Sequence, residues 1–307
     1  AKKNIYGCYD INKNLSINFS HKFNCKSFEN PNKLIEDKNI DIIFICTYHN
    51  SLFKYALKCL HENKHIFIEK PGGKNLKELL LLQGEIKKKK FLHVHIGFNH
   101  RFHPSIEKAK QIIKKTNLGK LMYIRANYGH GARLNYNKEW RMLKPISGGG
   151  ELIDQGSHII DLSRYFMGNL VLKNCFLNNF FWKSKVEDNA FLLLSDKQSN
   201  KVAYLHCSCT EWKNKFLFEI FFEKGKIEIN GLGGSYGVET LILYKMKKQM
   251  GKPKVKKWKF NHKDYSWMKE INYFLKNIRR NLKSESNILN AVENMKIIEE
   301  CYPKYKL

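Results

Sequence analysis

The order of strand-like and helix-like segments constrains the fold of this chain more than any other feature of its sequence. In the first part, short apolar runs alternate with amphipathic helical patterns. The strand-like runs lie at 4–9, 41–47, 65–69 and 92–98, and the helical patterns lie at 51–62 and 76–89. Because such alternation produces parallel strands with helices on the faces of the sheet, we predict an α/β domain over residues 1–118.

The pattern changes after residue 118. Longer segments with apolar residues at every second position follow, and helical patterns lie between and after them. The period-two segments lie at 121–128, 189–194, 202–209 and 216–222, and the helical patterns at 150–166, 265–278 and 288–300. Period-two alternation is typical of antiparallel strands with one buried face. We therefore predict a second, α+β domain over residues 119–307, with a mostly antiparallel sheet and flanking helices.

A run of three glycines, Gly148–Gly150, leads directly into a segment that mixes polar and aliphatic residues. On an α-helix, Asp154, His158 and Asp161 stand at i, i+4 and i+7 and share one face. Glycines at a helix N-terminus leave backbone N–H groups open to an anion or a polar ligand. The pattern fits a proton-transfer site, and it also fits the solvated side of a surface helix.

A second cluster closes the strand-like run that begins at His65. This run ends in Glu69 and Lys70, and a Pro-Gly-Gly turn follows at 71–73. Ligands of open α/β sheets bind at the carboxyl ends of the strands, so Lys70 is a candidate site residue. In a lysine-rich chain, an exposed surface lysine is the plain alternative.

Together, these clusters resemble the Gfo/Idh/MocA family of NAD(P)-dependent oxidoreductases. The resemblance is carried by the Glu69-Lys70-Pro71 strand end and by Gly-Gly-Gly-x-Leu-x-Asp-x-Gly-x-His-x-x-Asp over 148–161. In addition, 99–104 is similar to the family's Asn-x-Arg-Phe-x-Pro segment, and 140–141 to its Trp-Arg pair. The resemblance covers nearly the whole chain. It implies hydride transfer between NAD(P) and a hydroxyl carbon of a sugar, sugar nucleotide or cyclitol.

The resemblance also implies the catalytic residues Lys70, Asp154 and His158. His158 is the expected acid/base, because the ordinary pKa of histidine lies near working pH. Asp154 is expected either to bind a substrate hydroxyl or to orient the imidazole. Lys70 is expected to stabilise alkoxide charge and to hold the nicotinamide ribose. The expected substrate-binding residues are Arg101, His130, Asp154 and His158, with Arg133 nearby, although surface cations of a basic protein are the alternative for the arginines.

The expected cofactor contacts are Asp10, Thr47, Glu69, Lys70, Trp140 and Arg141. Asp10 ends the first strand-like run, in the place of the acid that binds the adenine-ribose hydroxyls, which favours NAD. Lys13 nearby leaves NADP open. Thr47 corresponds to the family's Thr-Pro-x-x-x-His segment, but Tyr48 replaces the proline and Leu52 replaces the histidine.

The pyrophosphate-binding Gly-x-Gly-x-x-Gly turn that opens family members has no counterpart before Asp10. We therefore expect the chain to lack the first strand and glycine loop, a βα unit of about 30 residues. The later glycine cluster, 231–237, does not replace that turn. Its last glycine is one position late and a strand-like run follows, so a hairpin loop is predicted.

A formal net charge of +27 raises the possibility of nucleic-acid binding. The lysines are dispersed, however, and the densest run, 87–90, ends a predicted helix where cations suit the helix dipole. We therefore predict no nucleic-acid partner. A basic nucleic-acid-binding protein and a catalytically silent, cofactor-binding regulator of the same fold remain the alternatives to an enzyme.

The cysteines and the apolar stretches indicate the cellular compartment. Eight scattered cysteines fit no zinc or disulfide framework, which favours a reducing cytoplasm. No stretch approaches the ~18 apolar residues of a membrane span. His61 and His65 match the His-Glu-x-x-His zinc pattern, but a helix end near Asn63 separates them, so no metal is predicted. By resemblance, the open sheet face of the second domain favours a homo-oligomer.

Overall fold

The computed structural model describes residues 5–198, 200–249, 251–261 and 263–304. Its α-helices are α1 Lys13–Phe23, α2 Pro31–Glu36, α3 His49–His61, α4 Leu76–Lys88, α5 Pro104–Lys115, α6 Lys144–Ser147, α7 Ser157–Met167, α8 Ser266–Arg279 and α9 Ile288–Cys301. Its strands are β1 Gly7–Cys8, β2 Lys26–Ser27, β3 Ile42–Ile45, β4 His65–Glu69, β5 Val94–Gly97, β6 Leu121–Gly129, β7 Val171–Asn178, β8 Asn189–Ser195, β9 Val202–Ser208, β10 Lys215–Phe222, β11 Gly225–Asn230, β12 Glu239–Lys245 and β13 Lys254–Phe260. Shorter turns are η1 Asn99–Phe102, η2 Tyr136–Lys138, η3 Trp140–Met142, η4 Leu152–Gly156 and η5 Tyr302–Lys304.

The first part of the chain is a parallel α/β fold, as predicted. Strands β3, β4 and β5 pair in parallel, with Ile45, Ile68 and Ile96 aligned across the sheet. Strands β1 and β2 form a separate parallel pair within the described residues. The predicted strand at 4–9 begins outside those residues, at Asn4. The carboxyl ends of β3 and β4 lead directly to Thr47 and Lys70.

The second part is built on a sheet in the order β13-β12-β11-β10-β6-β9-β8-β7. Its pairs are antiparallel except for β6 with β9, so the mostly antiparallel prediction is confirmed. The 231–237 segment joins antiparallel β11 and β12, which confirms the predicted hairpin loop. Strands β7 and β13 were not predicted. A register shift interrupts β7, and the sequence of β13 is largely lysine, which an edge strand tolerates.

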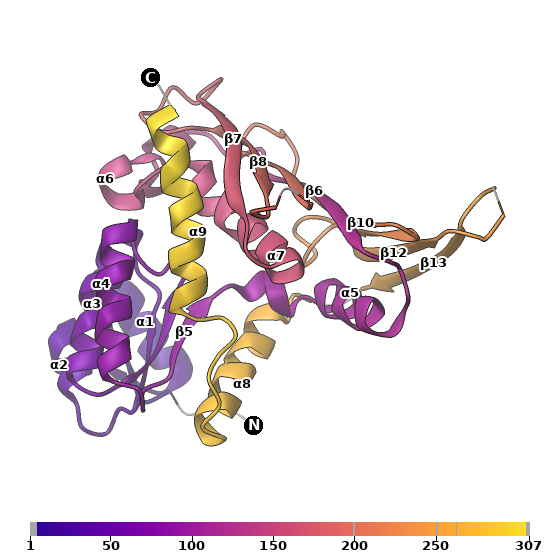
Figure 1. The fold of residues 1–307 in the computed structure, drawn as a ribbon. Helices are drawn as coiled ribbons and strands as arrows, with labels where there is room; N and C mark the ends of the chain where they lie inside the picture. Colours follow the sequence, from indigo (N-terminus) through magenta and orange to yellow (C-terminus); the bar gives the residue numbers. More distant parts are fainter. Residues whose placement is uncertain (1–4, 199, 250, 262, 305–307) are drawn as a thin grey trace.

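The last two helices return to the first domain. Phe274 on α8 packs its ring against those of Phe44 and Phe67 on β3 and β4. Helix α9 lies between α4 and β7, and it joins the two parts of the molecule (Figure 1). The division at residue 118 stays a prediction, because α8 and α9 follow that boundary in sequence yet contact the first domain.

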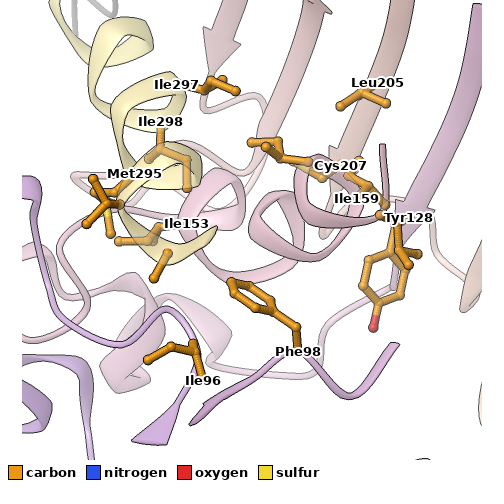
Figure 2. Close-up of a cluster of buried hydrophobic side chains, with 14 of the residues drawn as sticks. Ile96, Phe98, Tyr128, Ile153, Ile159, Leu205, Cys207, Met295, Ile297 and Ile298 are labelled. Carbon is orange, nitrogen blue, oxygen red and sulfur yellow. The ribbon is translucent and has the colours of Figure 1, made fainter. Parts of the chain in front are cut away.

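A shared core holds the glycine-rich segment in place. Figure 2 shows buried side chains from β5, β6, β9, the η4–α7 segment and α9 in one cluster. Ile153 and Ile159 enter this cluster from the segment that carries Asp154 and His158, and both are at most 1% exposed. The predicted aliphatic face of this segment is therefore buried, so the segment is a rigid support.

The predicted continuous helix over 150–166 is wrong at its start. Leu152–Gly156 forms a π-helical turn, and the α-helix begins at Ser157. The extra residue of this turn shifts the helical register between Asp154 and His158. Asp154 binds Lys70 and Arg141, whereas Asp161 binds Arg101.

The structure bears on the His-Glu-x-x-His match and on membrane-spanning helices. His61 is the last residue of α3, and His65 is the first residue of β4, so the two do not share a helical face, as predicted. Within the part of the chain that the structure describes, no group of His, Cys, Asp or Glu is arranged to hold a metal ion. No described helix has both the length and the hydropathy that crossing a bilayer requires.

Candidate active site

The structure brings the two predicted clusters together. Lys70 Nζ donates to the backbone carbonyl of Asp154 at 2.9 Å and also contacts its carboxylate. Arg141 Nε donates to the other carboxylate oxygen of Asp154 at 3.0 Å. Burial alone would raise the pKa of Asp154, but Lys70 and Arg141 outweigh it and hold that pKa well below its usual range. Asp154 is therefore an anion fixed between two cations.

His158 is buried beside this group and is neutral. Burial, followed by the charges of Lys70 and His103, holds its pKa well below 6.5. The ordinary pKa of histidine, on which the expected acid/base role was based, therefore does not apply to His158, because protein encloses the imidazole. Neutral imidazole is the form that can accept a proton. Asp154 makes no hydrogen bond to His158 in the described structure, so it does not orient that ring.

The imidazole of His100 stacks on that of His158, with ring centroids 3.8 Å apart. His100 was the unassigned position of the Asn-x-Arg-Phe-x-Pro segment, so nothing in the sequence singled it out. The stack forms because η1 and the first turn of α7 pack together in the core. The ring of His100 therefore contacts His158 directly, whereas Asp154 forms no hydrogen bond to it.

The glycine run binds the buried carboxyl group of Glu187. The N–H groups of Gly150 and Leu152 donate to Glu187 Oε1 at 3.0 and 3.1 Å, and the Tyr302 hydroxyl donates to the same oxygen at 3.2 Å. A Cβ atom on Gly150 would lie 2.0 Å from the Glu187 carbonyl oxygen, and one on Gly149 would lie 1.7 Å from the Tyr302 hydroxyl. The expectation that these N–H groups await a ligand is thus wrong at Gly150, since close packing of the chain requires the glycines.

Glu187 makes the stability of the fold depend on pH. Burial raises its pKa from 4.5 to about 7, against the opposing bonds from the backbone N–H groups of Leu152 and Gly150. The folded chain then binds this proton more tightly than the unfolded chain. Glu187 therefore contributes stability that is complete below pH 4.5 and is lost as the pH rises through about 7.

We expect Glu187→Gln to remove this component of the pH dependence. In the parent, the free energy of unfolding should fall between about pH 5 and 8 by up to about 3 kcal/mol from this one group. The variant should lack that decrease, because glutamine does not titrate. Urea denaturation at both pH values measures the difference. An unchanged decrease in the variant would show that other groups cause it.

His130 is placed close to the glycine-rich segment. Its Nε2 lies 3.5 Å from Glu151 Oε1, which also accepts a hydrogen bond from the Tyr136 hydroxyl. Burial lowers the pKa of His130, but Glu151 raises it by more, and the net change is upward. His130 is therefore a partly buried histidine beside the site, and Glu151 favours its protonated form.

Arg101 does not fit its expected substrate role. Its Nε donates to Asp161 at 2.7 Å, its Nη2 donates to the same carboxylate, and its Nη1 donates to the carbonyl of Glu285. The two bonds to Asp161 are buried, which commits the guanidinium to an internal ion pair. Arg133 pairs with Glu139 on the surface.

The expected cofactor residues gather mainly at one edge of the first sheet. Thr47 follows β3, and Glu69 ends β4, where burial raises its carboxyl pKa. Trp140 places its ring 5.0 Å from that of Tyr48. Asp10 lies after β1, in the separate sheet. It is exposed, and its carboxylate accepts only the backbone N–H of Asn12 among the described residues.

His49 belongs to this edge and was missed. It is the first residue of α3, and its Nδ1 lies 2.8 Å from the carbonyl of Ser147, next to the glycine run. Its ring meets the Trp140 ring edge-on at 4.9 Å. Burial and Lys70 lower its pKa to about 4, so it is neutral. The family's Thr-Pro-x-x-x-His segment ends in a histidine at the position of Leu52. His49 lies only three residues before that position, and this was the available signal.

Two sequence profiles match the chain. Residues 1–98 match an oxidoreductase family described as an NAD-binding Rossmann fold, and residues 106–228 match the GFO/IDH/MocA C-terminal domain. Levoglucosan dehydrogenase of Pseudarthrobacter phenanthrenivorans is 28% identical over 56% of this chain and 44% of its own length. Myo-inositol 2-dehydrogenase of Thermotoga maritima is 25% identical over 83% of this chain and 74% of its own length.

The fold has solved counterparts. A levoglucosan dehydrogenase in complex with NADH and levoglucosan superposes with a TM-score of 0.87 at 20% identity, over 97% of this chain and 89% of that one. At this identity the likeness concerns the fold, and it covers both domains.

Proposed function

The chain belongs to the GFO/IDH/MocA family of oxidoreductases with an NAD-binding Rossmann fold, and from this premise we propose that it acts as a dehydrogenase on a sugar, sugar nucleotide or cyclitol. Matched relatives include dehydrogenases of levoglucosan and of myo-inositol. The observation that carries the proposal is the ion pair of Lys70 with Asp154 beside a neutral, buried His158.

The residues at or after the carboxyl ends of β1, β3 and β4 suit a dinucleotide. Asp10 offers an exposed carboxylate without a cationic partner among the described residues, which fits ribose hydroxyl donors. Thr47, Glu69 and Trp140 line the region next to Lys70, where the nicotinamide ribose would lie. When bound, NAD(P) supplies the hydride acceptor or donor at nicotinamide C4.

The catalytic group moves one proton and stabilises one charge. In the oxidation direction, His158 accepts the hydroxyl proton while the C–H hydride leaves the same carbon, which becomes a carbonyl. Lys70 stabilises negative charge that develops on the substrate oxygen, and Arg141 helps to keep Asp154 ionised. Asp154 accepts a hydrogen bond from a neighbouring substrate hydroxyl. His130 is the second substrate-binding residue of this proposal.

Cofactor binding tests the first half of the proposal. We expect NADH to bind, and Asp10→Ala to weaken NADH about tenfold or more, because a hydrogen bond to a charged group is lost. NADPH binding should not weaken, since the same change removes repulsion of the 2′-phosphate. Titration followed by nicotinamide fluorescence measures both.

The matched control for Asp10 is Asp41→Ala, an exposed carboxylate at the amino end of β3 that should leave both affinities unchanged. An equal loss of both cofactors in Asp10→Ala would remove Asp10 from the ribose site. Absence of binding by either cofactor would contradict the dehydrogenase proposal, and a screen of polyols and sugars follows only if one binds.

We further propose that the chain forms a homo-oligomer through the outer face of its second sheet. Phe176, Leu193 and Tyr204 on β7, β8 and β9 are 58%, 40% and 46% exposed, and Leu193 is the register partner of Tyr204. Contiguous exposed apolar side chains of this kind mark interfaces. Sedimentation velocity should show a species larger than the monomer. Tyr204→Arg should shift it towards the monomer, and an unchanged distribution would exclude this face.

The cysteines support a reducing compartment. Cys59 and Cys207, for example, are free thiols and are fully buried. Because disulfides are rare in the cytoplasm, buried free thiols such as these favour that compartment.

A further inference from the structure

The stacked pair of His100 and His158 is an unusual feature of the buried site. The two rings lie nearly parallel, at an interplanar angle of 20°, with centroids 3.8 Å apart. His100 reaches this place from η1, and His158 from the first turn of α7. Rings of Tyr128 and Phe216 pack edge-on around His100 at 5.1 and 6.1 Å. His100 is thus enclosed by aromatic side chains on the sides that His158 does not cover.

The hydrogen bonds of His100 define which nitrogen carries its proton. Its Nδ1 lies 3.0 Å from the Asn99 side-chain oxygen. An amide oxygen only accepts, so Nδ1 is the donor and Nε2 holds the lone pair. That Nε2 is buried and has no partner among the described residues. A second proton on His100 would therefore be buried without an acceptor, which strongly disfavours the imidazolium form.

His158 has a complementary arrangement. Its Nδ1 is also buried without a partner, so Nε2 is the ring nitrogen left to meet a substrate hydroxyl. Among the described residues, none forms a hydrogen bond to Nδ1 of this ring, in contrast to active-site histidines that a carboxylate orients. The face-to-face contact with His100 is the closest ring contact that His158 makes.

Within the described part of the chain, the charged and titratable groups around the pair provide no counter-ion for it. Lys70, at the end of β4, and His103, after η1, both lower the pKa of His158. Tyr128 faces the pair from β6, and Asp154 is held by Lys70 and Arg141. Glu239 of β12 lies 3.2 Å from His103, not from the pair. Two adjacent imidazolium ions would therefore repel each other with no carboxylate bonded to either ring.

We propose that His100 is the positioning residue of His158, fixing the plane of its imidazole by ring stacking and keeping water from its inner face. This inference rests on the proposed function, in which His158 is the acid/base. The stack takes the place of the usual carboxylate partner, and a neutral aromatic ring in this place favours the neutral, proton-accepting form of His158. What matters at position 100 is thus a planar ring and not an ionisable group.

Two substitutions separate stacking from proton transfer. His100→Ala removes the ring, so kcat should fall about tenfold or more because the base is misplaced, while KM changes less than about threefold. The acid limb of the pH profile should move up towards pH 6.5, because water reaches the imidazole. His100→Phe restores a planar ring, and kcat and the pH profile should return to within about threefold of the parent.

A measurement without turnover keeps the proposal testable. In the full-length protein labelled with ¹⁵N-histidine, NMR titration should give a His158 pKa well below the ordinary value in the parent and in His100→Phe, and a higher one in His100→Ala. His95→Ala is the matched control. His95 is also buried and ring-stacked, on Phe67, and its substitution should leave the His158 pKa unchanged.

The outcomes are distinct. An unchanged His158 pKa and kcat in His100→Ala would overturn the proposal. A loss in His100→Phe as large as in His100→Ala would also overturn it, because an ionisable ring would then be required. If His100→Ala does not fold, the titration of His100→Phe still tests whether a planar ring that cannot ionise is sufficient at position 100. If His158 proves dispensable for activity, the proposed acid/base role fails while the NMR result still judges the stacking.

Discussion

Replacing His158 by alanine is expected to lower kcat by about two to four orders of magnitude, the range that a general base contributes. The reason is geometric. His158 is a neutral imidazole beside the Lys70–Asp154 ion pair, so it can take the substrate proton while Lys70 stabilises the oxygen. Steady-state kinetics with the best substrate of a polyol and sugar screen, over about pH 5 to 10, measures the effect.

The control for this variant is His61→Ala, at the exposed end of α3, which should retain the parental kcat. NADH affinity should be unchanged in His158→Ala, because the imidazole acts on the substrate proton. A kcat within a few-fold of the parent at every pH would remove His158 from the acid/base role. A cofactor-binding chain without turnover on any substrate would favour the silent regulator.

The second large effect is expected at Gly150, where alanine should lower the free energy of unfolding by more than about 3 kcal/mol or prevent folding. An added Cβ atom would lie 2.0 Å from the carbonyl oxygen of Glu187 and 3.0 Å from two further backbone atoms of that residue. The atoms of Glu187 in this contact are backbone atoms and cannot rotate away. Moving it would also break the bonds from Gly150 and Leu152 to the Glu187 carboxylate.

Urea denaturation followed by circular dichroism measures the Gly150→Ala effect. Gly84→Ala is the matched control, because Gly84 lies inside α4 with no atom within 4 Å of an added Cβ. It should stabilise the chain by about 0.4 to 1 kcal/mol through a less flexible unfolded state. If Gly150→Ala were as stable as the parent, the close approach of Glu187 would not be the reason for a glycine there.

Much of the fold was predictable because local patterns report local structure. Apolar runs such as 42–45 and period-two runs such as 202–208 identified buried parallel strands and half-buried antiparallel strands. The edge strand β13 could not be found in this way, since an edge position lets lysines replace apolar residues. The π turn over 152–156 was missed because the apolar residues Leu152, Ile153, Ile159 and Ile160 also fit an uninterrupted helical pattern.

The partners of the site residues were harder to predict than the residues. Lys70, Asp154 and His158 follow from motifs, and the structure indeed brings Lys70 to Asp154 across 84 residues of sequence. The roles of the supporting groups could not be inferred from motifs. Arg101 pairs with Asp161 inside the protein, and Glu187 binds the glycine run.

The sequence by itself determined the class of each domain, the family and the catalytic candidates. Hydrophobic periodicity and motif spacing are local properties, which can be recognised within a few consecutive residues. Only the tertiary structure decided that Asp154 is held by two cations, that His158 stacks on His100 and that the carboxyl group at the glycines is that of Glu187. These facts depend on which distant segments pack together. Burial then sets each charge state, because a low-dielectric interior makes a pKa depend on neighbours that no local pattern contains.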